Sequence, residues 1–232
     1  MKLNKKKVVV ASLAVSLVAI LSFGTIAWFS DTDEVTNKFM VATSDEDKDS
    51  IFSVDVFEQV DEDNDGIFEG KGDYDNVYSG YTYEDILPGD NLGKKPWVRN
   101  TGSYNQYVRV KVTIDNAAAW QTIFTKYGLT LNDIFLGHDE AEWSRNDDET
   151  TVDVNADTMT YVYYLDRILE PHQDGGKDAY LFTSVMIPTE LTREDMAEFA
   201  LGEFSLKILA EAVQTEHVGA NAIEAFDTVM GD

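Results

Sequence analysis

The chain has no cysteine, only four prolines and three histidines, and 18 basic residues against 43 acidic ones. Without cysteine it has no disulfide, no thiol nucleophile and no thiolate zinc site, so core packing, metal or assembly must hold the fold. The shortage of basic residues argues against nucleic acid as a partner, because binding phosphates requires lysine and arginine. Aromatic residues at 12% and apolar residues at 44% still predict a folded chain rather than a disordered acidic one.

The first 27 residues have the three parts of a secretory signal peptide. A lysine cluster comes first, an apolar run extends from Val8 to about Phe23, and Thr25-Ile26-Ala27 supplies the small-x-small pattern that signal peptidases cleave. We expect cleavage between Ala27 and Trp28, with membrane contact only during export. The alternative is a permanent anchor, because the apolar run is long enough to span a bilayer. Against the anchor, no basic stop-transfer segment follows the run.

Removal of the signal peptide makes the chain strongly acidic. Residues 1–27 hold four of the 18 basic residues and none of the 43 acidic ones, which leaves 14 basic against 43 acidic residues and a net charge of −29. Such a chain is repelled by anionic lipid and attracts divalent cations outside the cell. We expect a secreted or cell-surface protein with a single domain over residues 28–232.

Period-two alternation of apolar and polar residues predicts strands along the whole mature chain. The predicted strands are Phe52–Val56, Pro96–Val98, Val108–Ile114, Tyr161–Leu165, Tyr180–Ile187 and Phe204–Ala212. Short helices are expected in the connections, at residues 120–127 before Gly128, from Thr192 onward, and at 220–229. This distribution predicts an all-β fold with minor helices, arranged as a β-sandwich.

An acidic, glycine-rich insertion interrupts the strand pattern at residues 61–80. It opens with Asp61-x-Asp63-x-Asp65-Gly66, the first half of a calcium loop, in which oxygens at positions 1, 3 and 5 converge around a glycine bend. Position 12 is Gly72 rather than glutamate, so Asp73 or Asp75 would have to close the site. The alternative is a solvated acidic hairpin tip. Ca²⁺ is the one cofactor that the sequence indicates.

The motifs of common enzymes are missing from the sequence. His138, His172 and His217 form no His-Glu-x-x-His pattern, and there is no Gly-x-Ser-x-Gly motif and no glycine-rich phosphate loop after a strand. A zinc site would require the scattered histidines to meet in space. The sequence therefore predicts no catalytic residue.

The segment directly after the expected cleavage site is unusually apolar for a free terminus. Its apolar residues, set among acidic and polar ones, are Trp28, Phe29, Val35, Phe39 and Val41. A frayed terminus is the alternative, but apolar groups of this kind require a partner surface. As an extended strand, residues 28–41 can pair with the chain's own sheet or with the edge of another molecule.

Several motifs are similar to those of one protein family. Thr25-Ile26-Ala27-Trp28-Phe29-Ser30-Asp31, followed by Asn37-Lys38-Phe39, resembles the export signal of the TasA and camelysin family of Gram-positive bacteria. That family's pattern is Thr-x-Ala, an aromatic pair, Ser or Thr, Asp, then Asn-x-Phe. Leu87-Pro88-Gly89-Asp90 and Asn100-Thr101-Gly102-Ser103 are similar to two inner motifs of the family, and the strand from Phe204 to Val213 resembles its closing strand.

The resemblance implies export by the general secretion pathway, a dedicated type I signal peptidase as a partner, and a jelly-roll-like antiparallel β-sandwich. It also implies self-association into extracellular biofilm-matrix fibres, in which residues 28–41 of one subunit add as a donor strand to the next. The runner-up is a secreted metallopeptidase, as camelysin is described, although no zinc motif in this chain supports it. The acidic loops and the tail after Gln214 depart from the family, which leaves an accessory matrix protein as a further alternative.

Overall fold

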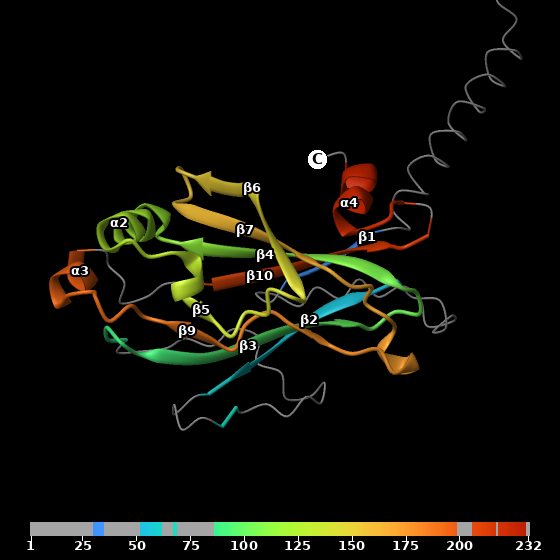
Figure 1. Ribbon diagram of the computed structural model, residues 1–232, viewed down its shortest axis with the longest axis horizontal. Coiled ribbons are helices and arrows are strands. Elements are labelled where there is room, and N and C mark those ends of the chain that lie inside the picture. Colours follow the sequence, from blue (N-terminus) through green and yellow to red (C-terminus); the bar gives the residue numbers. More distant parts are fainter. Residues whose placement is uncertain are drawn as a thin grey trace, which may run out of the picture.

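The computed structural model of the protein describes residues 30–34, 52–61, 67–68, 86–198, 206–216 and 218–230. These residues form two antiparallel sheets that face each other, with short helices around them (Figure 1). The chain passes repeatedly from one sheet to the other, since β1 and β2, β3 and β4, and β9 and β10 lie in different sheets. The predicted all-β antiparallel sandwich with minor helices is confirmed.

The first sheet, sheet A, contains the long strands and has the order β1-β10-β4-β7-β6. Its strands are β1 (Ser30–Glu34), β10 (Leu206–Gln214), β4 (Gln106–Asp115), β7 (Thr158–Leu165) and β6 (Trp143–Asp153). The β10–β4 ladder runs without interruption from Leu206 opposite Ile114 to Gln214 opposite Gln106. As the alternation predicts, Val108, Val110 and Val112 are fully buried and face the other sheet.

The second sheet, sheet B, has the order β2-β3-β9-β5, with β8 also beside β3. Its strands are β2 (Val54–Val60), β3 (Asn91–Asn100), β9 (Ser184–Met186), β5 (Phe135–Leu136) and β8 (Ala179–Tyr180). A turn precedes β3, in which the Asp90 N–H donates to the Leu87 carbonyl at 3.1 Å. Gly89 has a φ of 93°, which favours glycine at this turn.

The core between the sheets is the stabilising feature of a chain that has no disulfide. Among its fully buried members are Trp120, Trp143 and Phe182. Burying each such side chain contributes on the order of 2–3 kcal/mol. Helix α2 (Ala117–Tyr127) closes one end of this core with Trp120 and ends at Gly128 in the left-handed conformation, as predicted.

The remaining helical segments are short. Helix α3 (Arg193–Glu198) begins at Thr192, whose Oγ1 accepts a 3.1 Å hydrogen bond from the Asp195 N–H, which confirms the predicted helix start. Two 3₁₀ turns, η1 (Leu131–Asp133) and η2 (His172–Asp174), lie in connections. Helix α4 (Ala222–Met230) lies on the outer face of sheet A, where Phe226 is buried in a second apolar cluster (Figure 1).

Candidate functional site

The predicted donor segment contributes one strand to the described structure. β1 lies at an edge of sheet A, antiparallel to β10, in a register that runs from Ser30 opposite Val213 to Glu34 opposite Leu209. Ser30 is the third residue after the expected cleavage site. β1 and β10 also lie across from β2 of the other sheet. The N-terminal segment therefore closes one edge of sheet A in its own chain.

The strand that closes this edge brings no apolar residue to it. β1 reads Ser-Asp-Thr-Asp-Glu, with three acidic residues in five. The register sets Asp31 and Asp33 opposite Ala212 and Ala210, the positions of β10 that are fully buried in the core. Each backbone hydrogen bond of the β1–β10 ladder contributes about 0.5–1.5 kcal/mol net.

A buried ionic cluster supports β10 from the outer face of sheet A. Arg109 is 2% exposed, and its Nε lies 2.5 Å from Glu211 Oε2, while Lys111 Nζ lies 3.1 Å from the same oxygen. The Arg109 guanidinium also lies 4.5 Å from the centre of the Phe226 ring of α4. Glu211 is the β10 residue opposite Thr32 of β1. The positive charges of Arg109 and Lys111 therefore balance the negative charge of Glu211, which lies beside the acidic strand β1.

A tyrosine and a second carboxylate extend the same cluster. Tyr164 donates a 2.8 Å hydrogen bond to Glu149 Oε1, and Glu149 Oε2 lies 3.5 Å from Arg109 Nη1. Burial raises the pKa of Tyr164 to about 12, so its hydroxyl stays protonated and can donate at any physiological pH.

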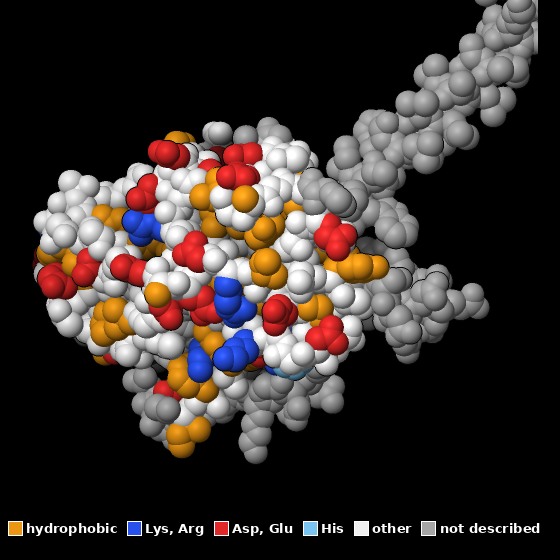
Figure 2. Space-filling view, turned by 45° about the vertical axis from the view of Figure 1, so that its right-hand side comes forward, with side chains coloured by type: hydrophobic (Ala, Val, Ile, Leu, Met, Phe, Trp, Pro, Cys, Tyr) orange, Lys and Arg blue, Asp and Glu red, His pale blue; other side chains and the backbone are white. Residues whose placement is uncertain are grey.

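Figure 2 shows one face of the molecule, on which Asp and Glu are spread widely and Lys and Arg are few.

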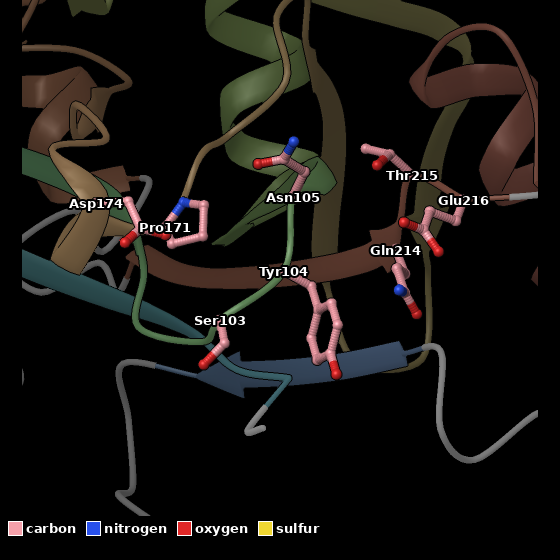
Figure 3. A pocket seen from close by; sticks show the side chains of 8 residues that line it. All are labelled: Ser103, Tyr104, Asn105, Pro171, Asp174, Gln214, Thr215 and Glu216. Carbon is pink, nitrogen blue, oxygen red and sulfur yellow. The ribbon is translucent and has the colours of Figure 1, made fainter. Parts of the chain in front are cut away.

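A polar hollow of about 230 Å³ lies at the end of β10 beside the start of β1. Figure 3 shows its lining side chains, which come from the β3–β4 loop, the η2 region and the end of β10: Ser103, Tyr104, Asn105, Pro171, Asp174, Gln214, Thr215 and Glu216. A larger groove of about 620 Å³ lies between the start of α4 and the end of β7. Asp61, the one predicted site residue that the structure describes, lines neither space. The described residues that line the hollow are mostly polar.

Most of the predicted assembly and metal residues lie outside the described residues. These are Ala27, Trp28, Phe29, Val35, Phe39, Val41, Asp63, Asp65 and Asp73. Asp61 is described, and it is 5% exposed at the end of β2, where its N–H donates to the Gly93 carbonyl at 3.0 Å. Asp61 therefore continues the β2–β3 ladder.

The described histidines have structural partners. His138 Nδ1 lies 3.0 Å from the Leu181 carbonyl oxygen, and His172 Nδ1 lies 3.6 Å from Asp178 Oδ1. His217 lies outside the described residues. In the described ranges, no group of three or more His, Cys, Asp or Glu residues is arranged to hold a metal. No helix in that same part of the chain is long and apolar enough to cross a membrane, and the predicted signal peptide lies outside it.

The ionic cluster under α4 was not predicted from the sequence. Its signal is present in β4, where Arg109 and Lys111 alternate with core valines, but the partner Glu211 is 102 positions away from Arg109. Comparison of the chain with protein-family models, with curated proteins and with solved structures found no match.

Proposed function

We propose that this chain is a secreted or cell-surface structural protein that assembles by N-terminal strand exchange into extracellular biofilm-matrix fibres. The observation that carries the proposal is β1, an edge strand that begins three residues after the expected cleavage site and pairs with β10. In a fibre, the N-terminal segment of one subunit takes the place of β1 beside β10 of the next subunit. Each subunit then donates one strand and accepts one. Repeating this contact head to tail gives an open filament rather than a closed ring.

The composition of the segment favours exchange over permanent self-pairing. Within one chain, β1 pairs through five residues of which none is apolar. A segment supplied by a neighbour can also engage Val35 and Phe39, and burying two such side chains contributes roughly 3–6 kcal/mol before ordering costs. The tether gives self-pairing an effective concentration on the order of millimolar, so the closed monomer is expected in dilute solution. Assembly should therefore depend steeply on protein concentration.

Charge sets the solution conditions for this assembly. The mature chain has 14 basic residues against 43 acidic ones, and its net charge of −29 opposes close stacking of subunits. Divalent cations or moderately acidic pH reduce this repulsion. Both are expected to promote fibres, and high monovalent salt should do so in part because it screens exposed charges.

The test compares the mature protein with a form that lacks residues 28–41, by electron microscopy and sedimentation at several calcium concentrations. The mature protein should form filaments, and the truncated form should stay monomeric. A synthetic peptide of residues 28–41 should then bind the truncated form and cap it. A matched variant, Val35→Ser with Phe39→Ser, keeps β1 intact and should also stay monomeric. Filaments from the truncated form would overturn the strand-exchange mechanism.

Calcium binding by the loop that starts at Asp61 is a separate part of the proposal. The half-motif lacks a glutamate at position 12, so we expect binding only in the millimolar class of extracellular modules. Calorimetry on the mature protein should detect this binding, and Asp63→Ala should abolish it. Identical titrations of the two proteins would instead support the solvated hairpin tip.

A further inference from the structure

One pair of oppositely charged side chains lies inside the sandwich. Glu58 of β2 is 1% exposed and Lys94 of β3 is 6% exposed, and Lys94 Nζ contacts Glu58 Oε1. The β2–β3 register sets Val56 opposite Val98 and Val60 opposite Lys94. Because alternate residues share a face, Glu58 and Lys94 lie on the same side of sheet B as the core residues Val56 and Val98.

This pair has little polar support compared with the cluster around Arg109. Within the described residues, Glu58 and Lys94 have only each other as side-chain hydrogen-bonding partners. Arg109, in contrast, contacts Glu211, Glu149 and the Tyr164 hydroxyl. Removing two charges from water is expensive when few other hydrogen bonds compensate them. Burial lowers the pKa of Lys94 to about 7, so near neutral pH its amine is substantially in the uncharged, nucleophilic form.

We propose that Lys94 and Glu58 condense to form an intramolecular isopeptide bond. A proton first passes from the ammonium to the carboxylate, which gives a neutral amine and a carboxylic acid. The Nζ lone pair then attacks Cδ of Glu58, the Nζ–Cδ bond forms and the Cδ–OH bond breaks. The hydroxyl leaves with a proton from Nζ as water. Ammonium and carboxylate become a secondary amide and one water, with no oxidant or other reactant.

The fold supplies what this reaction needs. Two neighbouring strands hold amine and carboxyl in contact, which replaces a bimolecular encounter by an intramolecular one of high effective molarity. The product amide is neutral, so the desolvation penalty of two buried charges disappears. The bond links β2 to β3 across the connection of residues 61–90, in a chain that has no cysteine to cross-link. Like a disulfide, it restricts the unfolded chain. It does not depend on fibre assembly.

Peptide mapping of the purified mature protein by mass spectrometry tests the proposal directly. Trypsin should release residues 49–71 joined to residues 72–99 as one branched peptide, lighter than its parts by one water for the cross-link. The Lys94–Lys95 bond should resist trypsin, because an acylated lysine is no substrate. Separate peptides 49–71 and 72–94, with unmodified Glu58 and a free Lys94, would overturn the proposal.

Three variants test whether the lost water comes from the bond between Lys94 and Glu58. Lys94→Arg keeps a cation beside Glu58 but has no nucleophilic amine, so it should have the full sequence mass. Lys95→Arg changes the next residue, whose Nζ lies 4.4 Å from the centre of the Tyr180 ring, and should keep the cross-link. Glu58→Gln should release ammonia instead of water and reach the same final mass as the cross-linked parent protein.

The variants also distinguish the cross-link from dehydration at an Asp-Gly sequence such as Asp174-Gly175, which loses one water too. A water loss that persists in Lys94→Arg would come from such a site and would overturn the proposal. If Lys94→Arg does not fold, the peptide map of the parent protein still decides between a branched peptide and two linear ones.

Discussion

The two edges of sheet A are built in different ways. β6 is an eleven-residue strand whose register with β7 shifts between Asn146 and Thr151, and most of its residues are polar or charged. β1, at the other edge, has five residues in unbroken register with β10 and no buried apolar anchor in its sequence. A register shift is a device that keeps further strands from pairing with an edge, and β1 has none. β6 is thus a protected edge, whereas β1 covers the edge that the proposed exchange would use.

The two edges also differ in how they join the core. β6 begins with Trp143, which is 1% exposed and whose Nε1 donates a 2.9 Å hydrogen bond to the Tyr180 carbonyl of the other sheet. β1 has a regular backbone ladder with β10 alone. The comparison predicts that β6 is essential for stability and that β1 is dispensable for it.

The largest effect is expected for Trp143→Ala. The change removes a fully buried indole and should lower the free energy of unfolding by about 3–5 kcal/mol. Removing residues 28–34 should cost clearly less, because β1 buries no apolar residue of its own. Urea unfolding of both forms under the same conditions checks this. If the truncation costs as much as Trp143→Ala, β1 is an integral strand and the exchange becomes implausible.

A smaller effect is expected for Glu211→Ala on β10. Arg109 is 2% exposed and would lose the carboxylate that lies 2.5 Å from its Nε, so the free energy of unfolding should fall by about 2–3 kcal/mol. The matched change on the protected edge is Arg145→Ala, which breaks an exposed pair with Asp147 and should cost less than about 1 kcal/mol. Urea midpoints measure both. Equal costs would show that the cluster under α4 does not stabilise β10.

Proline substitutions at Asp31 and Thr32 should differ from each other. Successive N–H groups of a strand point to opposite sides, so one of the two prolines removes a hydrogen bond to β10 and the other faces the open side. The first should weaken the edge by about 1–2 kcal/mol. Hydrogen exchange of β10 amides and the fibre yield measure the two variants. Equal behaviour would contradict the β1–β10 ladder.

Asp195 tests how acid changes the stability of the sandwich, separately from any effect of acid on the β1–β10 edge. Hydrogen bonds from Lys126, Tyr127 and Thr192 hold the pKa of Asp195 well below its ordinary value of 3.8. A carboxyl group whose pKa is lower in the folded than in the unfolded state stabilises the fold. This contribution is fully present when the pH is above the unfolded-state pKa, and it is lost as the pH falls below that value. The stability difference between the parent and Asp195→Asn should therefore be constant at neutral pH and shrink below about pH 4. Urea unfolding from pH 7 to pH 2 measures it, and a difference that persists to pH 2 would contradict the assignment.

The elements that could be predicted from the sequence are those with one apolar and one polar face. β4 and β10 alternate regularly and were predicted nearly to their ends, and α2 was predicted with its terminal Gly128. In each case local periodicity and packing favour the same structure. The same holds for Thr192 and Asp195, whose spacing is that of a helix start.

In the elements that the sequence did not predict, local periodicity and packing do not favour the same structure. β6 was not predicted, because an edge strand with a register shift and many charged residues shows no steady alternation. β3 extends from Asn91 to Asn100, far beyond the predicted Pro96–Val98, because Lys94, Lys95 and Pro96 break its pattern. The charged clusters join residues on different strands, so only the register shows that Arg109 meets Glu211 or that Lys94 meets Glu58.

The pairing of β1 with β10 also has a consequence for the order of folding. Ser30 lies opposite Val213, so the first described strand is completed by the last one. Contacts between residues so distant in sequence form late, because the loss of chain entropy on closing the loop must be compensated by structure already present. The ladder from β10 through β4 to β7 can form without β1. The N-terminal strand is therefore expected to be the last one added, which leaves β10 open for a time in each newly made molecule.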